Sequence, residues 1–139
     1  MPSTMPLGAR VVALTALLWN LFGLLILVLR VLAPEQAAAA PEQAALEAAL
    51  PAWLDAVFGV AVIAGMAGSV GLLLARRWAP TLLLVSFVAV AVQIAAGYLF
   101  APLWASTGAA GAATSGLLLL MVGAIWSFAR AAGRRGWLR

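Results

Sequence analysis

The sequence predicts an all-α integral membrane protein, a bundle of four membrane-spanning helices, and three observations lead to this prediction. Of the 139 residues, 66% are hydrophobic and 9% are charged, which is about a third of the charged fraction of a soluble domain. Four apolar runs are free of charge and close to the roughly 20 residues that cross a hydrocarbon core. The charged residues between these runs are distributed unevenly between the two sides of the predicted bundle.

The spans are identified as charge-free runs, and the short tails and connections leave one membrane domain, residues 1–139. The first run lies between Arg10 and Arg30, and it is longer than the apolar region of a signal peptide, about 7 to 15 residues. We therefore expect it to be retained as a span. The predicted spans are residues 11–29, 56–74, 79–101 and 112–129, with an outer segment at 34–52.

The arginines predict the orientation of the chain, because cytoplasmic loops carry the excess of positive charge. With four spans, seven of the eight arginines fall on the side of the two termini. Arg30 falls on the other side together with all four acidic residues. Both termini are therefore predicted to be cytoplasmic. The exclusive use of arginine as the cation and the abundance of alanine suggest a GC-rich bacterial genome. We expect a multi-pass protein of a bacterial inner membrane.

The outer segment contains a near-repeat of seven residues, PEQAAAA followed by PEQAALE. Pro41 and Glu42 form a helix start, since proline fits the first helical position and an acidic side chain complements the helix dipole. We expect a short Ala-rich helix in the outer loop. The repeat has two interpretations, either low-complexity alanine drift or a cap over an outward cavity.

Small residues form stripes on two of the predicted spans, as helix interfaces in membranes require. On the second span the stripe covers about 120° of arc, and on the fourth span it follows one side. These stripes predict close helix packing, either within a closed bundle or with a second copy. The predicted packing glycines are Gly65, Gly68, Gly71, Gly116 and Gly123.

Two amides lie within the predicted spans, where polar groups are costly unless they are paired. Asn20 is at the middle of the first span and Gln93 is in the third, each on a face of small residues. They are interpreted either as an interhelical hydrogen-bonded pair or as the lining of a small polar cavity with Trp19 nearby. In the second interpretation Trp19, Asn20 and Gln93 bind an uncharged, hydroxyl-rich ligand.

Arginines at the span ends are expected to contact the lipid bilayer, because each cation near an anionic surface contributes about 1 kcal/mol. Arg30 is interpreted as a snorkelling residue paired with Glu35 or Asp55, or alternatively as a gate that attracts anions. Nucleic acid is not an expected partner. The predicted lipid headgroup anchors are Arg76, Arg77, Arg130, Arg134 and Arg135.

The residue types argue against an enzyme. The chain has no His, Cys or Lys, so its Ser and Thr hydroxyls have no base to activate them. It carries no GxSxG, HExxH or phosphate-binding glycine motif. We expect no catalytic residue, no metal and no cofactor. Proton-driven export is also disfavoured, because no titratable group lies at mid-depth in a predicted span.

Several strings resemble a family of small bacterial four-span inner-membrane proteins that are often labelled sugar transporters. The resemblance covers nearly the whole chain, and its motifs are structural; two of the strings contain Asn20 and Gln93. The family label implies a sugar as the ligand. The strings are LLWNLFG at 17–23, PEQAALEAALPAW at 41–53, GSVGLLLARRWA at 68–79, LLLVSFVAVAVQ at 82–93 and RGW at 135–137.

Two classes of function follow from the sequence. The first is a non-enzymatic structural or accessory membrane protein, whose glycine-rich second span docks on a second copy or on another membrane protein. The second is a small-solute carrier, with sugars as the candidate solutes, that acts as a homodimer because four short helices enclose little volume.

Overall fold

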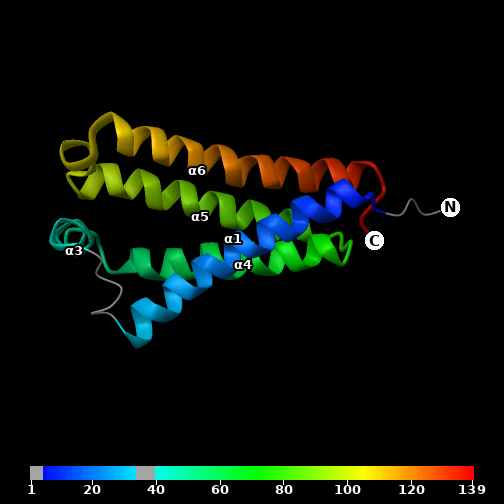
Figure 1. The fold of residues 1–139 in the computed structure, drawn as a ribbon, viewed down its shortest axis with the longest axis horizontal. Helices are drawn as coiled ribbons and strands as arrows, with labels where there is room; N and C mark the ends of the chain where they lie inside the picture. The colour runs from blue at the N-terminus through cyan, green and yellow to red at the C-terminus, as the bar shows by residue number, and fades with distance from the viewer. Residues whose placement is uncertain (1–4, 34–39) are drawn as a thin grey trace.

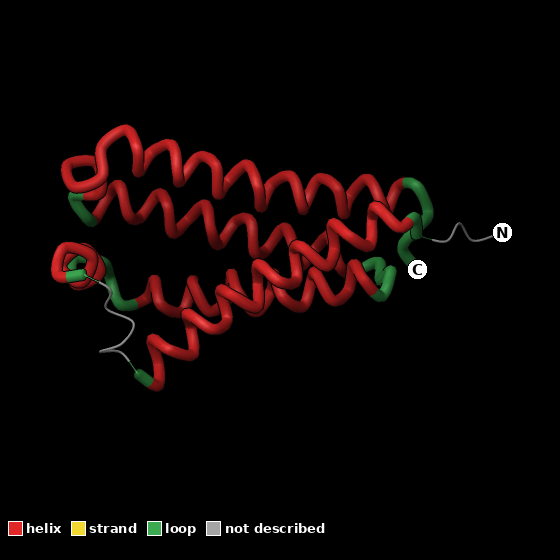
Figure 2. Tube along the Cα trace, in the orientation of Figure 1, coloured by secondary structure: helices red, strands yellow, loops and turns green. Residues whose placement is uncertain are grey.

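The computed structural model describes residues 5–33 and 40–139, except for the side chains of residues 42, 43 and 47. The start of the predicted outer segment, residues 34–39, lies outside the described residues. The described chain is all-helical, with short connections between the helices (Figures 1 and 2). Its helices are α1 (Leu7–Leu32), α3 (Pro41–Ala48), α4 (Trp53–Leu73), α5 (Ala79–Phe100) and α6 (Leu103–Arg134).

Four of these helices, α1, α4, α5 and α6, are long and apolar enough to cross a membrane, which confirms the predicted number of apolar spans. They run lengthwise through the molecule (Figure 1). The beginning of α1 and the end of α6 lie at one end, called the basic end here because Arg10, Arg76, Arg77 and the arginines after residue 129 belong to helix ends and turns there. The short helix α3 lies at the opposite end.

The helices extend beyond several of the predicted spans. Helix α1 includes both Arg10 and Arg30, because helical hydrogen bonding continues past the hydrocarbon boundary and a long arginine side chain reaches the interface from inside a helix. Helix α6 begins nine residues before the predicted span, but Gly108 interrupts it with non-helical dihedral angles (φ 56°, ψ −145°). The turn before Gly108 runs crosswise to the rest of α6 (Figure 1).

Helix α4 is the central helix of the bundle. It packs against α1 and α5, and α5 packs in turn against α6. Of the most apolar window of α4, 44% of the residues are buried, compared with 22% or less for the other long helices. The helices are therefore connected in the series α1, α4, α5, α6, and α1 and α6 are the edge helices of this series.

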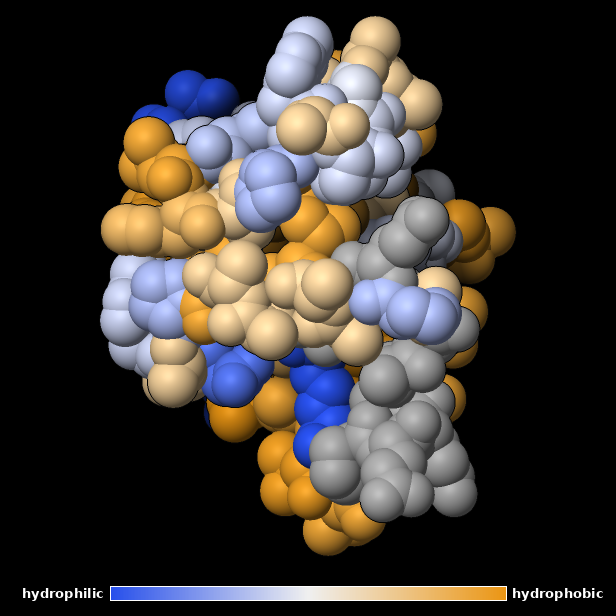
Figure 3. Space-filling view, turned by 90° about the vertical axis from the view of Figure 1, so that its left-hand side faces the viewer, coloured by the Kyte–Doolittle hydropathy of each residue, from blue (hydrophilic) through white to orange (hydrophobic). Residues whose placement is uncertain are grey.

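Small residues face inward and large apolar residues face outward. The buried positions of α1 are all alanines, Ala9, Ala13 and Ala16, whereas Phe22 and Leu25 on the same helix are more than half exposed. A soluble protein seldom exposes so large an apolar surface, but in lipid this arrangement lets the helices approach closely while the large side chains contact acyl chains. From the end that holds α3, most of the strongly hydrophobic residues appear toward the margins, and the area between them mixes weakly hydrophobic with hydrophilic residues (Figure 3).

The basic end is organised by two helix caps of the same kind. At the end of α4, Ala75 adopts φ 54°, and the Arg76 amide donates a hydrogen bond to the Gly71 carbonyl at 2.7 Å. At the end of α6, Gly136 adopts φ 71°, and the Trp137 amide donates to the Ala132 carbonyl at 3.1 Å. Both are Schellman motifs, which satisfy carbonyls that have no partner within the helix.

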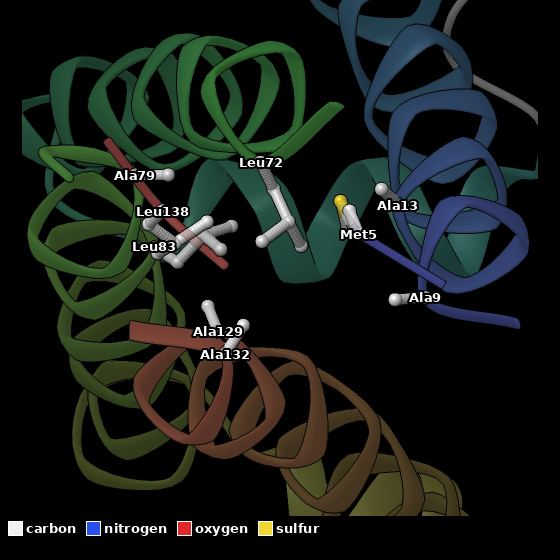
Figure 4. Close-up of a cluster of buried hydrophobic side chains, with 9 residues drawn as sticks. All are labelled: Met5, Ala9, Ala13, Leu72, Ala79, Leu83, Ala129, Ala132 and Leu138. Atoms are coloured by element: carbon white, nitrogen blue, oxygen red, sulfur yellow. The ribbon is translucent and has the colours of Figure 1, made fainter. Parts of the chain in front are cut away.

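Backbone hydrogen bonds join the segment after α6 to the turn between α4 and α5. The Arg139 amide donates to the Ala75 carbonyl at 2.5 Å, and the Arg77 amide donates to the Arg139 carbonyl at 3.0 Å. We call these two bonds the tail bridge. Beneath it, Leu138 is buried in a cluster with Leu72, Leu83 and Ala132, whose side chains point toward one another from α4, α5, α6 and the tail (Figure 4).

The two caps predict opposite effects of exchanging alanine and glycine. An L-residue with a side chain pays about 1 kcal/mol for the left-handed conformation that glycine adopts freely. Ala75→Gly should therefore raise the free energy of unfolding by about 0.5–1 kcal/mol, and Gly136→Ala should lower it by about 1 kcal/mol. Unfolding in mild detergent, followed by circular dichroism, measures both. The same sign for the two variants would contradict the assignment of these caps.

Candidate functional site

The main polar site within the described spans lies where α1, α4 and α5 meet, and we call it the Asn20 cluster: Asn20, Gly65, Ser69 and Ser86. The Asn20 side-chain amide donates hydrogen bonds to the Ala16 carbonyl at 2.8 Å and to Ser69 Oγ at 3.3 Å. The Ser69 hydroxyl donates to the Gly65 carbonyl at 2.8 Å. The cluster therefore connects α1 with α4 through side chains.

Ser86 connects the same region to α5. Its hydroxyl, on α5, donates a hydrogen bond to the Ala61 carbonyl on α4 at 2.7 Å. Ser69 and Ser86 are 0% and 4% exposed, so both hydroxyls are shielded from water. Loss of their hydrogen bonds would leave buried polar groups without partners and would destabilise the protein. No side-chain nitrogen or oxygen that is buried in the described part of the chain is left without a partner. The fully buried polar atoms of the cluster are thus hydrogen-bonded within the protein.

Gly65 is the point where the backbone of α4 comes closest to these side chains. A Cβ atom at Gly65 would collide with Asn20 Oδ1 and would lie 2.8 Å from Ser86 Oγ. Real Cβ atoms essentially never approach so closely, so a larger residue at this position must displace the side chain of Asn20 or Ser86. Gly65, one of the predicted packing glycines, therefore contacts side chains of both α1 and α5.

The other predicted packing glycines differ among themselves. A Cβ atom at Gly68 would lie 2.7 Å from the Leu83 side chain, and one at Gly71 would lie 2.5 Å from the Trp78 ring. On α6, a Cβ atom at Gly123 would lie 3.3 Å from Phe87, whereas one at Gly116 would meet nothing within 4 Å. The stripe on α4 is therefore packed within the chain, and the stripe on α6 is packed at Gly123 but open at Gly116.

The structure does not bring Asn20 and Gln93 together. Asn20 lies at the level of Ser86, since both side chains flank Gly65, and Gln93 is seven residues farther along α5, about 10 Å at 1.5 Å per residue. The interpretation of these amides as a hydrogen-bonded pair is therefore wrong. Gln93 is half-buried and has no side-chain hydrogen bond with the described residues.

Trp19 faces away from the Asn20 cluster. Its side chain is 43% exposed, because consecutive residues of a helix point about 100° apart and Asn20 occupies the packed side of α1. The described aromatic stacking pair involves Phe87 and Trp126. Trp19 and Asn20 thus point to different sides of α1, and Gln93 lies farther along α5.

Arg30, at the end of α1, contacts the beginning of α4. Its Nη1 lies 3.5 Å from Asp55 Oδ1, and its guanidinium lies over the Phe58 ring at 5.2 Å from the centroid. The Asp55 side chain is 78% exposed, so the ion pair contributes little by itself. Of the two interpretations of Arg30, these contacts favour the snorkelling residue paired with Asp55; Glu35 lies outside the described residues.

Two of the predicted headgroup anchors rest on tryptophan rings at the basic end. The Arg130 guanidinium lies 5.1 Å from the Trp126 ring centroid, and the Arg135 guanidinium lies 5.2 Å from that of Trp137. Such cation–π contacts hold an arginine beside an amphipathic ring, which itself prefers the membrane interface. The other predicted anchors, Arg76, Arg77 and Arg134, are exposed.

The chemistry of the Asn20 cluster is that of helix packing. Asparagine and serine side chains donate and accept hydrogen bonds, but the cluster contains no titratable group. Among the side chains described for residues 5–33 and 40–139, no three His, Cys, Asp or Glu side chains lie close enough to hold a metal ion. Ser69 was not identified from the sequence as a member of this site. Its position four residues after Gly65 places it on the same face of α4, and this spacing could have indicated its role.

Four apolar helices with an inward-facing set of small and hydroxyl residues define a multi-pass helical membrane protein, by length and composition. No protein-family model, curated protein or solved structure matches the chain.

The contacts of Gly65 predict a large effect of adding one methyl group. Gly65→Ala should destabilise the bundle by about 1–3 kcal/mol, because Asn20 or Ser86 must move to accommodate the Cβ atom. The matched control is Gly116→Ala, which makes the same change where nothing lies within 4 Å. Gly116→Ala should leave unfolding in detergent unchanged or shift it toward higher stability. Equal destabilisation by both variants would contradict the packing role of Gly65.

Proposed function

We propose that this chain is a non-enzymatic structural or accessory membrane protein. The observation that carries the proposal is that the polar side chains of the Asn20 cluster hydrogen-bond to other groups of the protein. Asn20 and Ser69 bond to each other and to backbone carbonyls, so these polar groups stabilise the contact between α1 and α4. Interhelical hydrogen bonds in membranes contribute about 0.6–2 kcal/mol each. This supports helix association rather than solute binding at Asn20.

The edge helices are the surfaces that we propose for assembly with a second copy or with another membrane protein. On α6, a Cβ atom at Gly116 would meet nothing within 4 Å, and α1 buries no residue after Ala16. A small residue with open space beside it lets a foreign helix approach closely. In this proposal α4 holds the bundle together, and α1 and α6 are available to a partner.

The proposal places the protein in a bacterial inner membrane with both ends of the chain in the cytoplasm. Arginines dominate the basic end, and cytoplasmic surfaces carry the positive excess. In this orientation α3 lies on the outer side, and the Arg30–Asp55 pair lies near the outer interface.

Fusion of a periplasm-sensitive reporter after Arg139 tests the orientation. The fusion should be inactive, because the basic end is proposed to remain in the cytoplasm; the same reporter placed after Pro51 should be active. An active fusion after Arg139 would overturn the topology.

Substitution of Asn20 tests the proposed function. Asn20→Leu removes the hydrogen bond to Ser69, so stability and assembly should fall, by roughly 0.6–2 kcal/mol for the lost bond. Native mass spectrometry of protein extracted in mild detergent reports the assembly and any co-purifying chain. A conservative control is Asn20→Gln. Unchanged stability and assembly together with loss of solute flux would contradict the accessory role.

A small-solute carrier, with sugars as the candidate solutes, is the second candidate, and Gln93 favours it. This amide has no side-chain hydrogen bond with the described residues and is half-buried within α5, as expected of a group that meets a solute or water. In this alternative, Gln93→Leu abolishes uptake of a sugar panel into proteoliposomes while the protein still accumulates. The accessory role instead requires that wild-type protein and Gln93→Leu show the same absence of flux.

A further inference from the structure

A cavity of about 200 Å³ opens at the basic end of the molecule. Three segments that are distant in the sequence form it: the beginning of α1 with Met5 and Arg10, the end of α4 with Leu73 and Leu74, and the tail after α6. The tail is held against the α4–α5 turn by the tail bridge. The walls of this cavity are therefore fixed by backbone hydrogen bonds as well as by packing.

The charged residues that line the cavity are both arginines, Arg10 and Arg139. Neither forms an ion pair with a described residue. Asp55 is the one acidic residue whose side chain the structure describes, and it lies at the start of α4, at the opposite end of the molecule. The first turn of α1 contains no acidic residue, so the positive end of its helix dipole adds to the charge of Arg10. Two arginines that line one hollow without an ion pair to a described side chain favour a phosphate, which guanidinium groups bind in bidentate geometry.

The remainder of the cavity is apolar. Met5 is buried, Leu74 is 63% exposed, and the Trp137 ring is half-buried. Inorganic phosphate has no group that benefits from such a lining. A phospholipid does, because its glycerol and acyl carbons lie directly beside its phosphate.

We propose that this cavity binds the phosphate group of an anionic membrane lipid, held between Arg10 and Arg139, with the apolar part of the lipid against Leu73 and Leu74. Arg10 and Arg139 are exposed, as are Arg76, Arg77 and Arg134. Binding in the cavity nevertheless differs from diffuse attraction to an anionic surface, because only Arg10 and Arg139 line it together with apolar side chains. The proposal is independent of the proposed accessory function, which rests on the Asn20 cluster.

Native mass spectrometry in detergent with added phosphatidylglycerol or phosphatidylcholine tests this binding. Wild-type protein should retain phosphatidylglycerol preferentially, and the double variant Arg10→Gln/Arg139→Gln should reduce retention about tenfold or more, as expected from the loss of two cations. Arg76→Gln/Arg134→Gln is the matched comparison: it removes the same charge from two predicted headgroup anchors outside the cavity, and it should reduce retention clearly less than the double variant of the cavity does. The Arg139 backbone bonds survive the substitution, and circular dichroism verifies folding.

Equal loss of lipid in both double variants would overturn the proposal in favour of diffuse attraction to the basic end. Equal retention of the two lipids by wild-type protein would overturn it as well. A competition experiment with inorganic phosphate distinguishes a lipid from free phosphate as the ligand. If phosphate fails to displace the bound lipid, the cavity is a lipid site. If phosphate displaces the lipid efficiently and is itself retained, the cavity binds free phosphate and the proposal is overturned. If Arg10→Gln/Arg139→Gln fails to fold, Leu74→Asp serves as the second variant, and unchanged lipid retention by Leu74→Asp would overturn the proposal.

Discussion

Close approach along the backbone of α4 is the constraint on which the rest of the bundle depends. Asn20, Leu83 and Trp78 lie against Gly65, Gly68 and Gly71, at distances that leave no room for a methyl group. Helix α1 and the beginning of α5 are thus positioned by the absence of side chains on one helix. Because lipid is as apolar as the helix surfaces, this packing replaces the hydrophobic driving force that a soluble protein would use.

The hydrogen bonds follow from the same geometry. Asn20 reaches Ser69, and Ser86 reaches the Ala61 carbonyl, because glycine and alanine bring the helix axes near enough for short polar side chains. A polar group in hydrocarbon is costly unless it is paired, so the pairs also discourage the helices from separating. Packing and polar pairing at the helix crossing therefore reinforce each other.

Sequence reasoning could predict the apolar helices and the small-residue face of α4, since both follow from hydropathy and the 3.6-residue period. It could not predict which partner Asn20 meets, because the relative levels of α1 and α5 depend on how both cross α4. The left-handed conformation of Ala75 and the break at Gly108 were also beyond reach, since an alanine carries no such signal and many glycines in this chain are helical. The open surface around Gly116 has the same cause: a small-residue stripe does not say whether its partner belongs to the same chain.

The tail bridge has a consequence for the order in which the protein assembles. Its donors and acceptors belong to the turn between α4 and α5 and to Arg139, so it forms only after all four long helices have been synthesised. Helices α4 and α5 are joined by a short capped turn and can pair early during insertion, whereas Leu138 enters its buried cluster last. Completion of the basic end is therefore a late step of biogenesis, and a chain truncated before Trp137 would lack both the tail bridge and Leu138.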